Sequence, residues 1–121
     1  MFLLTDKPGP PAGNIEFKSV TADKIWIEWE PVTDHGGSDV THYIAEIRET
    51  SRLVWSTISE ELSDCTVSVQ KLIRGAEYVF RVRGVNKFGL GDTLESEPVI
   101  AKNSFGKNLT LKRNECNLYS N

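Results

Sequence analysis

Polar and apolar residues alternate along most of this chain, with the period of two that is typical of β-strands with one buried face. The alternation is strictest in the stretch EYVFRVRGVN, where Tyr78, Phe80 and Val82 share one parity. Arg81 and Arg83 fall on the other parity. The pattern therefore predicts a strand whose large apolar side chains face a core and whose arginines face outward.

Six further segments show the same period and are separated by clusters of Gly, Pro, Asp, Asn and Ser, which favour turns. These predicted strands are residues 14–20, 23–30, 41–49, 52–59, 65–72 and 94–102. The stretch NKFGLGD is expected to be a glycine turn, and Pro98 is expected to mark an edge or a bulge. Seven short strands without helical periodicity favour an all-β antiparallel sandwich.

Composition changes at both ends of the predicted sandwich. The segment TDKPGPPAG is rich in proline and glycine, so we assign residues 1–12 to an extended, proline-rich linker. Residues 13–102 form the predicted domain. Residues 103–121 are rich in Asn and lack a clear alternation, and we expect a disordered or non-native tail, with the start of a further module as the alternative.

Charge and cysteine content exclude several classes of protein. The net charge of −3 argues against a nucleic-acid-binding protein, which is usually basic. No apolar run approaches the roughly 20 residues of a membrane span. Cys65 and Cys116 have no neighbouring Cys or His at zinc spacing, so we expect two free thiols and a reducing compartment.

No set of residues indicates catalysis or a bound cofactor. Asp34, His35, Asp39 and His42 lie in or near a glycine loop, but their spacing is not fixed and no nucleophile adjoins them. The GLG tripeptide precedes a strand and opens no helix, which argues against a dinucleotide site. We therefore expect a protein without enzymatic activity, metal or cofactor.

An ordered set of motifs along the chain resembles the fibronectin type III domain over about residues 8–103. The motifs are PGPP at 8–11, Trp29 followed by Glu-Pro, GGS before Tyr43, the spaced residues Leu72, Gly75 and Tyr78, RVRGVN at 81–86, and GLG at 89–91. The resemblance is strongest to the A-band repeats of titin and related giant muscle proteins. Val32 stands where that pattern often has proline, Gly84 stands where it often has alanine, and the chain departs from the pattern after Asn103.

The resemblance implies a seven-stranded, immunoglobulin-like sandwich in a cytoplasmic, sarcomeric protein, with an A-band location. Such modules serve thick-filament scaffolding and elasticity, and their partners would be thick-filament proteins and neighbouring immunoglobulin-like or fibronectin type III modules. The isolated domain is expected to be a monomer. The alternative is a fibronectin type III module of a cell-surface receptor or adhesion protein, which glycosylation of Asn108 in the NLT tripeptide would support.

The same resemblance assigns structural roles to inward-facing residues. The expected core comprises Trp29, Tyr43, Leu72, Tyr78, Phe80 and Val82. Trp29 is expected to pack between the sheets, and Tyr78 to form a tyrosine corner through a hydrogen bond from its hydroxyl to the nearby backbone.

The outward-facing residues permit two interpretations. The first is a solvated sheet face. The resemblance implies that the strand carrying Glu46 is the neighbour of the strand carrying the arginines, and ion pairs between them would contribute only about 0.2–1 kcal/mol each. The alternative is a docking face with the composition of a binding hot spot. The candidate partner surface then comprises Arg81, Arg83, Arg48, Ile44 and Trp55.

Overall fold

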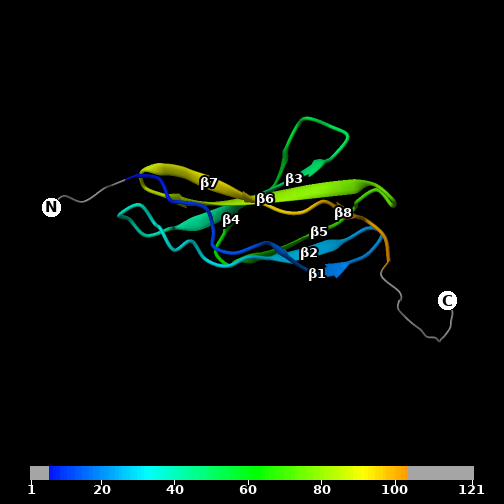
Figure 1. Ribbon diagram of the computed structural model, residues 1–121, viewed down its shortest axis with the longest axis horizontal. Helices are drawn as coiled ribbons and strands as arrows, with labels where there is room; N and C mark the ends of the chain where they lie inside the picture. The colour runs from blue at the N-terminus through cyan, green and yellow to red at the C-terminus, as the bar shows by residue number, and fades with distance from the viewer. Residues whose placement is uncertain (1–5, 104–121) are drawn as a thin grey trace.

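Eight strands form the described part of the chain, which is residues 6–103 of a computed structural model (Figure 1). In chain order they are β1 Glu16–Val20, β2 Ile25–Glu28, β3 His42–Glu49, β4 Ser56–Leu62, β5 Thr66–Val69, β6 Glu77–Asn86, β7 Gly89–Glu95 and β8 Val99–Ile100. No helix is assigned within this range. Cys116, Asn108 and nearly all of the predicted tail lie outside the described residues.

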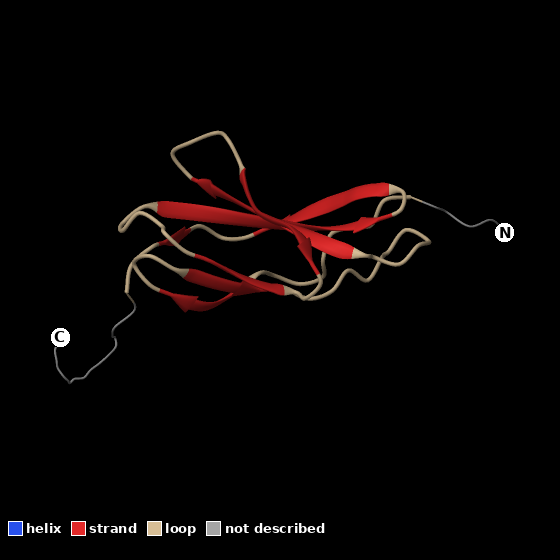
Figure 2. Cartoon of the chain, turned by 180° about the vertical axis from the view of Figure 1, so that it is seen from behind, coloured by secondary structure: helices blue, strands red, loops and turns tan. Residues whose placement is uncertain are grey.

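The strands are arranged in two antiparallel sheets that face each other, as Figure 2 shows from behind. One sheet has the order β1-β2-β5. The other has the order β4-β3-β6-β7, and β8 also pairs with β6. The predicted all-β antiparallel sandwich is therefore confirmed.

The core lies between the sheets and follows the parity of the strands. Trp29 and Tyr43 meet edge to face with ring centroids 5.9 Å apart, and Phe17 meets Phe80 in the same way at 6.2 Å. The buried apolar residues of this cluster are Ile15, Ile25, Ile27, Trp29, Tyr43, Ala45, Tyr78, Phe80, Val82 and Ala101. Both sheets contribute to it, which is the packing expected of a sandwich.

The prediction of one final strand over 94–102 was wrong, and so was the prediction of a turn through Gly91. The β6–β7 turn is tight, and β7 already begins at Gly89. The ladder ends at Ser96, whose amide donates to Phe80 O while its hydroxyl accepts from Phe80 N. Pro98 has no N–H to continue the pairing, so β8 is a separate, short strand.

The strand predicted over 52–59 begins later, because the chain first makes a loop that stands out from the sheet (Figure 1). Arg48 Nη1 donates to Arg52 O at 2.7 Å, and Thr50 N donates to Glu77 O at 2.9 Å. The first bond ties the loop back to β3, the second continues the pairing of β3 with β6, and β4 starts only at Ser56.

The segment before β1 packs along β7. Asp92 N donates to Pro8 O at 3.1 Å, and Pro8 is fully buried. A Cβ atom at Gly91 would lie only 2.7 Å from Pro8 O, so glycine is needed there for the close approach. The described chain thus enters at one end of the long axis, and it leaves after β8 at the other end (Figure 1).

Candidate functional site

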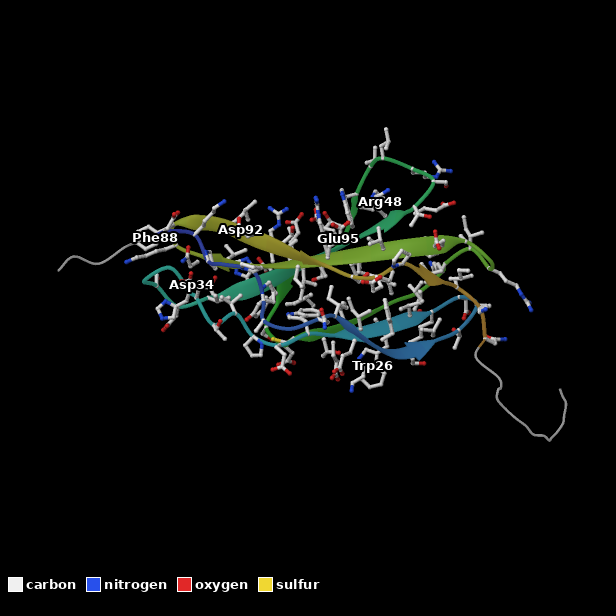
Figure 3. The ribbon with its side chains drawn as sticks, in the orientation of Figure 1. Trp26, Asp34, Arg48, Phe88, Asp92 and Glu95 are labelled. Atoms are coloured by element: carbon white, nitrogen blue, oxygen red, sulfur yellow. The ribbon has the colours of Figure 1, made fainter. Side chains whose placement is uncertain are left out.

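The outer face of the five-stranded sheet brings the predicted partner-surface residues together. β3 and β6 are neighbours in register, with Ile44 opposite Arg83 and Glu46 opposite Arg81. Arg48 follows on β3 with the same parity. Figure 3 shows Arg48 and Glu95 on this side of the molecule, whereas Trp26 lies on the opposite side.

Arg81 makes the shortest ion pair of this face. Its Nε lies 2.6 Å from Glu46 Oε1, and the side chains are only 25% and 17% exposed respectively. Arg83 Nη2 lies 3.8 Å from the same carboxylate oxygen. One glutamate therefore holds two arginines in place, and neither guanidinium extends freely into solvent.

Trp55 adds an aromatic surface to this cluster. The guanidinium carbon of Arg81 lies 4.2 Å from the Trp55 ring centroid, and that of Arg48 lies 5.1 Å from it. Both distances are within the range of cation–π attraction. We call Ile44, Arg48, Trp55, Arg81 and Arg83 the arginine face.

The arginine face combines guanidinium donors with an aromatic ring. Arginines combined with tryptophan are the residue types enriched at interface hot spots. Their donors suit carboxylates and carbonyl oxygens, which arginine recognises well. Because Glu46 and Trp55 already fix the orientation of Arg81, this face would lose little side-chain entropy on binding.

Sequence reasoning missed two exposed apolar residues beside this face. Leu53 is 93% exposed and Val54 is 75% exposed, on the loop between β3 and β4. The available signal was the apolar triplet LVW in a segment that was predicted as a strand. In a strand, neighbouring side chains of this triplet would point alternately to the core and to solvent. The loop instead leaves both Leu53 and Val54 exposed.

The residues predicted for the core lie on the inside of the sandwich, and the hydroxyls of two of them hold backbone segments. Tyr78 Oη accepts from Ile73 N at 2.9 Å, the geometry expected of a tyrosine corner. Tyr43 Oη accepts from Val32 N at 3.1 Å, and burial raises the Tyr43 pKa above its ordinary value. Trp29, Phe80 and Val82 are buried, and Leu72 is half-buried.

Trp26 and Cys65 are the remaining groups with distinctive chemistry. Trp26 is 41% exposed on the outer face of the three-stranded sheet, and its Nε1 donates to Thr66 Oγ1 at 2.6 Å. Cys65 is a half-buried free thiol, and burial raises its pKa.

Between residues 6 and 103, no group of three His, Cys, Asp or Glu side chains is placed to hold a metal ion. The same range contains no helix long and apolar enough to cross a membrane.

Comparison with known families identifies one match. The model of the fibronectin type III domain matches residues 9–102. The chain is 37% identical over 105 residues to titin of Drosophila melanogaster, and the alignment covers 86% of this chain and 1% of that protein. It is 32% identical over 101 residues to fast-type myosin-binding protein C of Mus musculus, and this alignment covers 84% of this chain and 8% of that protein.

Solved structures show a similar relationship. The crystal structure of domains A168-A170 from titin superposes with a TM-score of 0.73 and 34% sequence identity. The superposition covers 80% of this chain and 33% of that one. The chain thus corresponds to one part of much longer relatives, all three of which are muscle proteins.

Proposed function

The chain belongs to the fibronectin type III family, and from that premise we propose that it is a non-catalytic structural and protein-interaction module of a titin-like sarcomeric giant protein. As a repeat unit it contributes to thick-filament scaffolding and elasticity in the A-band. The observation that carries this proposal is the similarity to titin and to myosin-binding protein C along most of the chain.

The shape of the domain supports a role as a repeat unit. The described chain enters the sandwich at one end of its long axis and leaves at the other (Figure 1). Modules built in this way can be joined end to end without the linkers crossing a sheet face. Both sheets then keep their outer faces available for partners along the filament.

We place the partner contact of this module on the arginine face. Its side chains are oriented before binding by the 2.6 Å ion pair between Arg81 and Glu46 and by the two arginines beside Trp55. The partner is a protein of the thick filament that presents carboxylates to Arg81 and Arg83. Trp29, Tyr43, Leu72, Tyr78, Phe80 and Val82 maintain the sandwich and do not contact that partner.

The proposed function is tested by immunostaining with an antibody raised against residues 8–103. Striated muscle is stained after permeabilisation, and intact, unpermeabilised cells are stained in parallel. The proposal predicts regular cross-striations within the A-band and no surface signal. Surface staining without striations would overturn it and would favour a receptor or adhesion protein.

A further inference from the structure

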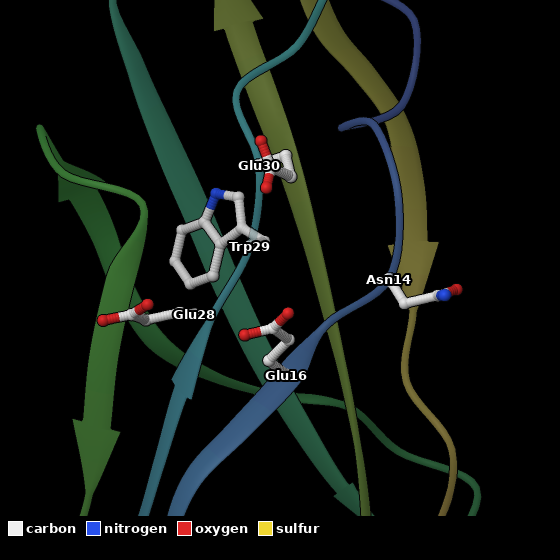
Figure 4. Close-up of a pocket in the computed structure, with 5 residues that line it drawn as sticks. All are labelled: Asn14, Glu16, Glu28, Trp29 and Glu30. Atoms are coloured by element: carbon white, nitrogen blue, oxygen red, sulfur yellow. The ribbon is translucent and has the colours of Figure 1, made fainter.

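A small pocket lies where β2 ends, beside the segment that leads into β1. It is lined by Asn14, Glu16, Glu28, Trp29 and Glu30, and its volume is about 40 Å³ (Figure 4). Three of these five side chains are carboxylates, and the fourth is the tryptophan that anchors the core. The pocket is on the three-stranded sheet, so it is separate from the arginine face.

The indole N–H of Trp29 is the unusual feature of this pocket. Trp29 is only 5% exposed, and its Nε1 is buried without a hydrogen-bond partner among the described residues. The backbone N–H of the same residue is satisfied by Cys65 O at 3.0 Å. In Figure 4 the indole nitrogen is on the edge of the ring that faces Glu30. Buried polar groups are nearly always paired, so this donor requires an acceptor.

The carboxylates of the pocket differ in their own partners. Glu16 and Glu28 are opposite each other on β1 and β2, and Lys18 Nζ lies 3.2 Å from the first and 3.6 Å from the second. Among residues 6–103, the Glu30 carboxylate is the one of the three that makes no ion pair. The pocket therefore presents the buried indole N–H of Trp29, the side-chain amide of Asn14 and carboxylate oxygens.

The chemistry of these groups selects the ligand. A cation would satisfy the carboxylates but cannot accept from the indole N–H, and an anion would be repelled by three carboxylates. The ligand must accept one hydrogen bond and donate another, as a water molecule does. About 40 Å³ is more than the space that one ordered water molecule needs.

We propose that this pocket is a binding site for ordered water, which accepts a hydrogen bond from Trp29 Nε1 and donates one to the carboxylate of Glu30. The water completes the hydrogen bonding of the core tryptophan without a direct contact between the indole and a charged side chain. It also links the centre of the sandwich to a carboxylate at the surface.

A high-resolution crystal structure of the full chain tests this directly. The proposal predicts density for a water at about 2.7–3.2 Å from Trp29 Nε1 and at a similar distance from a Glu30 oxygen. A direct hydrogen bond from Nε1 to a protein oxygen would overturn it. A pocket without density, or density with the short contacts of a metal ion, would overturn it as well.

Nuclear magnetic resonance tests the same site in solution. The indole signal of Trp29 is identified by its loss in Trp29→Phe, while Trp26 and Trp55 supply reference signals. The proposal predicts a water-to-indole nuclear Overhauser effect in the wild-type chain that is at least halved in Glu30→Ala. Glu60→Ala, which removes an exposed glutamate from β4, serves as the matched control and should leave the effect unchanged. An absent effect in the wild type, or an equal effect in Glu30→Ala, would contradict the proposal.

Discussion

The inner and outer faces of the five-stranded sheet are made by the same strands, yet they present opposite chemistry. On β6, Phe80 and Val82 are fully buried against the other sheet, whereas Arg81 between them points outward and pairs with Glu46. On β3, Ala45 is fully buried next to that glutamate. Alternation thus separates two tasks within one strand, with stability on the inner side and, as we propose, recognition on the outer side.

The two faces also differ in how much each side chain contributes to stability. An inner aromatic residue loses its whole contact area with water, and a cavity remains when it is removed. An outer arginine has a partner within the same face, but that pair is partly solvated and contributes little. Substitutions on the two faces should therefore have effects of very different size.

The largest effect is expected for adjacent residues on opposite faces of β6. Phe80→Ala should lower the free energy of unfolding by about 3–5 kcal/mol, because it leaves a cavity between the sheets. Arg81→Ala should lower it by less than about 1 kcal/mol. Chemical denaturation of both variants measures the difference, and losses of equal size would refute the division between the faces.

The tyrosine corner should produce the next largest effect. Tyr78→Phe keeps the buried ring but removes the acceptor for Ile73 N, which lies 2.9 Å from the hydroxyl oxygen. Because the backbone N–H loses its partner, the free energy of unfolding should fall by about 1–3 kcal/mol. A Tyr78→Phe variant as stable as the wild type would show that solvent replaces this hydrogen bond without cost.

The effects on stability of substitutions at Gly84 and Val32, two of the positions that depart from the titin-like pattern, should depend on each other. A Cβ atom at Gly84 would lie 3.1 Å from Val32 Cγ2 and 3.2 Å from Val40 Cγ1, which is closer than side chains normally pack. Gly84→Ala should therefore cost about 1 kcal/mol, and Val32→Ala in the same chain should relieve part of that cost. A double-mutant cycle measures the coupling, and strictly additive effects would contradict it.

The smallest effect is expected from Cys65. Burial raises the pKa of its thiol above the ordinary value of 9.0, so the folded state holds this proton more tightly than the unfolded state does. The resulting stabilisation is fully present below pH 9.0 and is lost as pH rises through the folded-state pKa. In a Cys116→Ser background, alkylation of Cys65 at pH 9 should be slower in the folded chain than in denaturant. Equal rates would contradict the raised pKa.

The fold was predictable because adjacent strand positions differ so strongly in polarity. The inward parity of Phe80 and Val82 follows from the sequence alone, as does the outward parity of Arg81. The family resemblance implied that β3 and β6 are neighbours, whereas the register that places Glu46 opposite Arg81 is known only from the structure. Neither could come from alternation, which does not fix which strands are neighbours.

Other features depend on contacts between distant segments. The start of β7 was predicted as a turn because its glycines favour turns, but Gly91 serves the close approach of Pro8. The exposure of Leu53 and Val54 depends on a loop whose start is fixed by the Arg48 Nη1 bond to Arg52 O and the Arg52 N bond to Glu49 O. Within residues 6–103 the indole N–H of Trp29 finds no acceptor, and this depends on side-chain positions around β1 and β2 that no sequence pattern specifies.

Binding of the tagged full chain to permeabilised striated myofibrils tests most directly whether recognition resides on the outer face. The comparison uses the wild type, the Arg81→Ala/Arg83→Ala variant and an Arg74→Ala control, which removes an exposed arginine outside the arginine face. The account predicts striated binding by the wild type and the control, and a loss of at least about tenfold in affinity for the double variant with its fold intact. Equal binding by the double variant, or no striated binding by the wild type, would contradict the account.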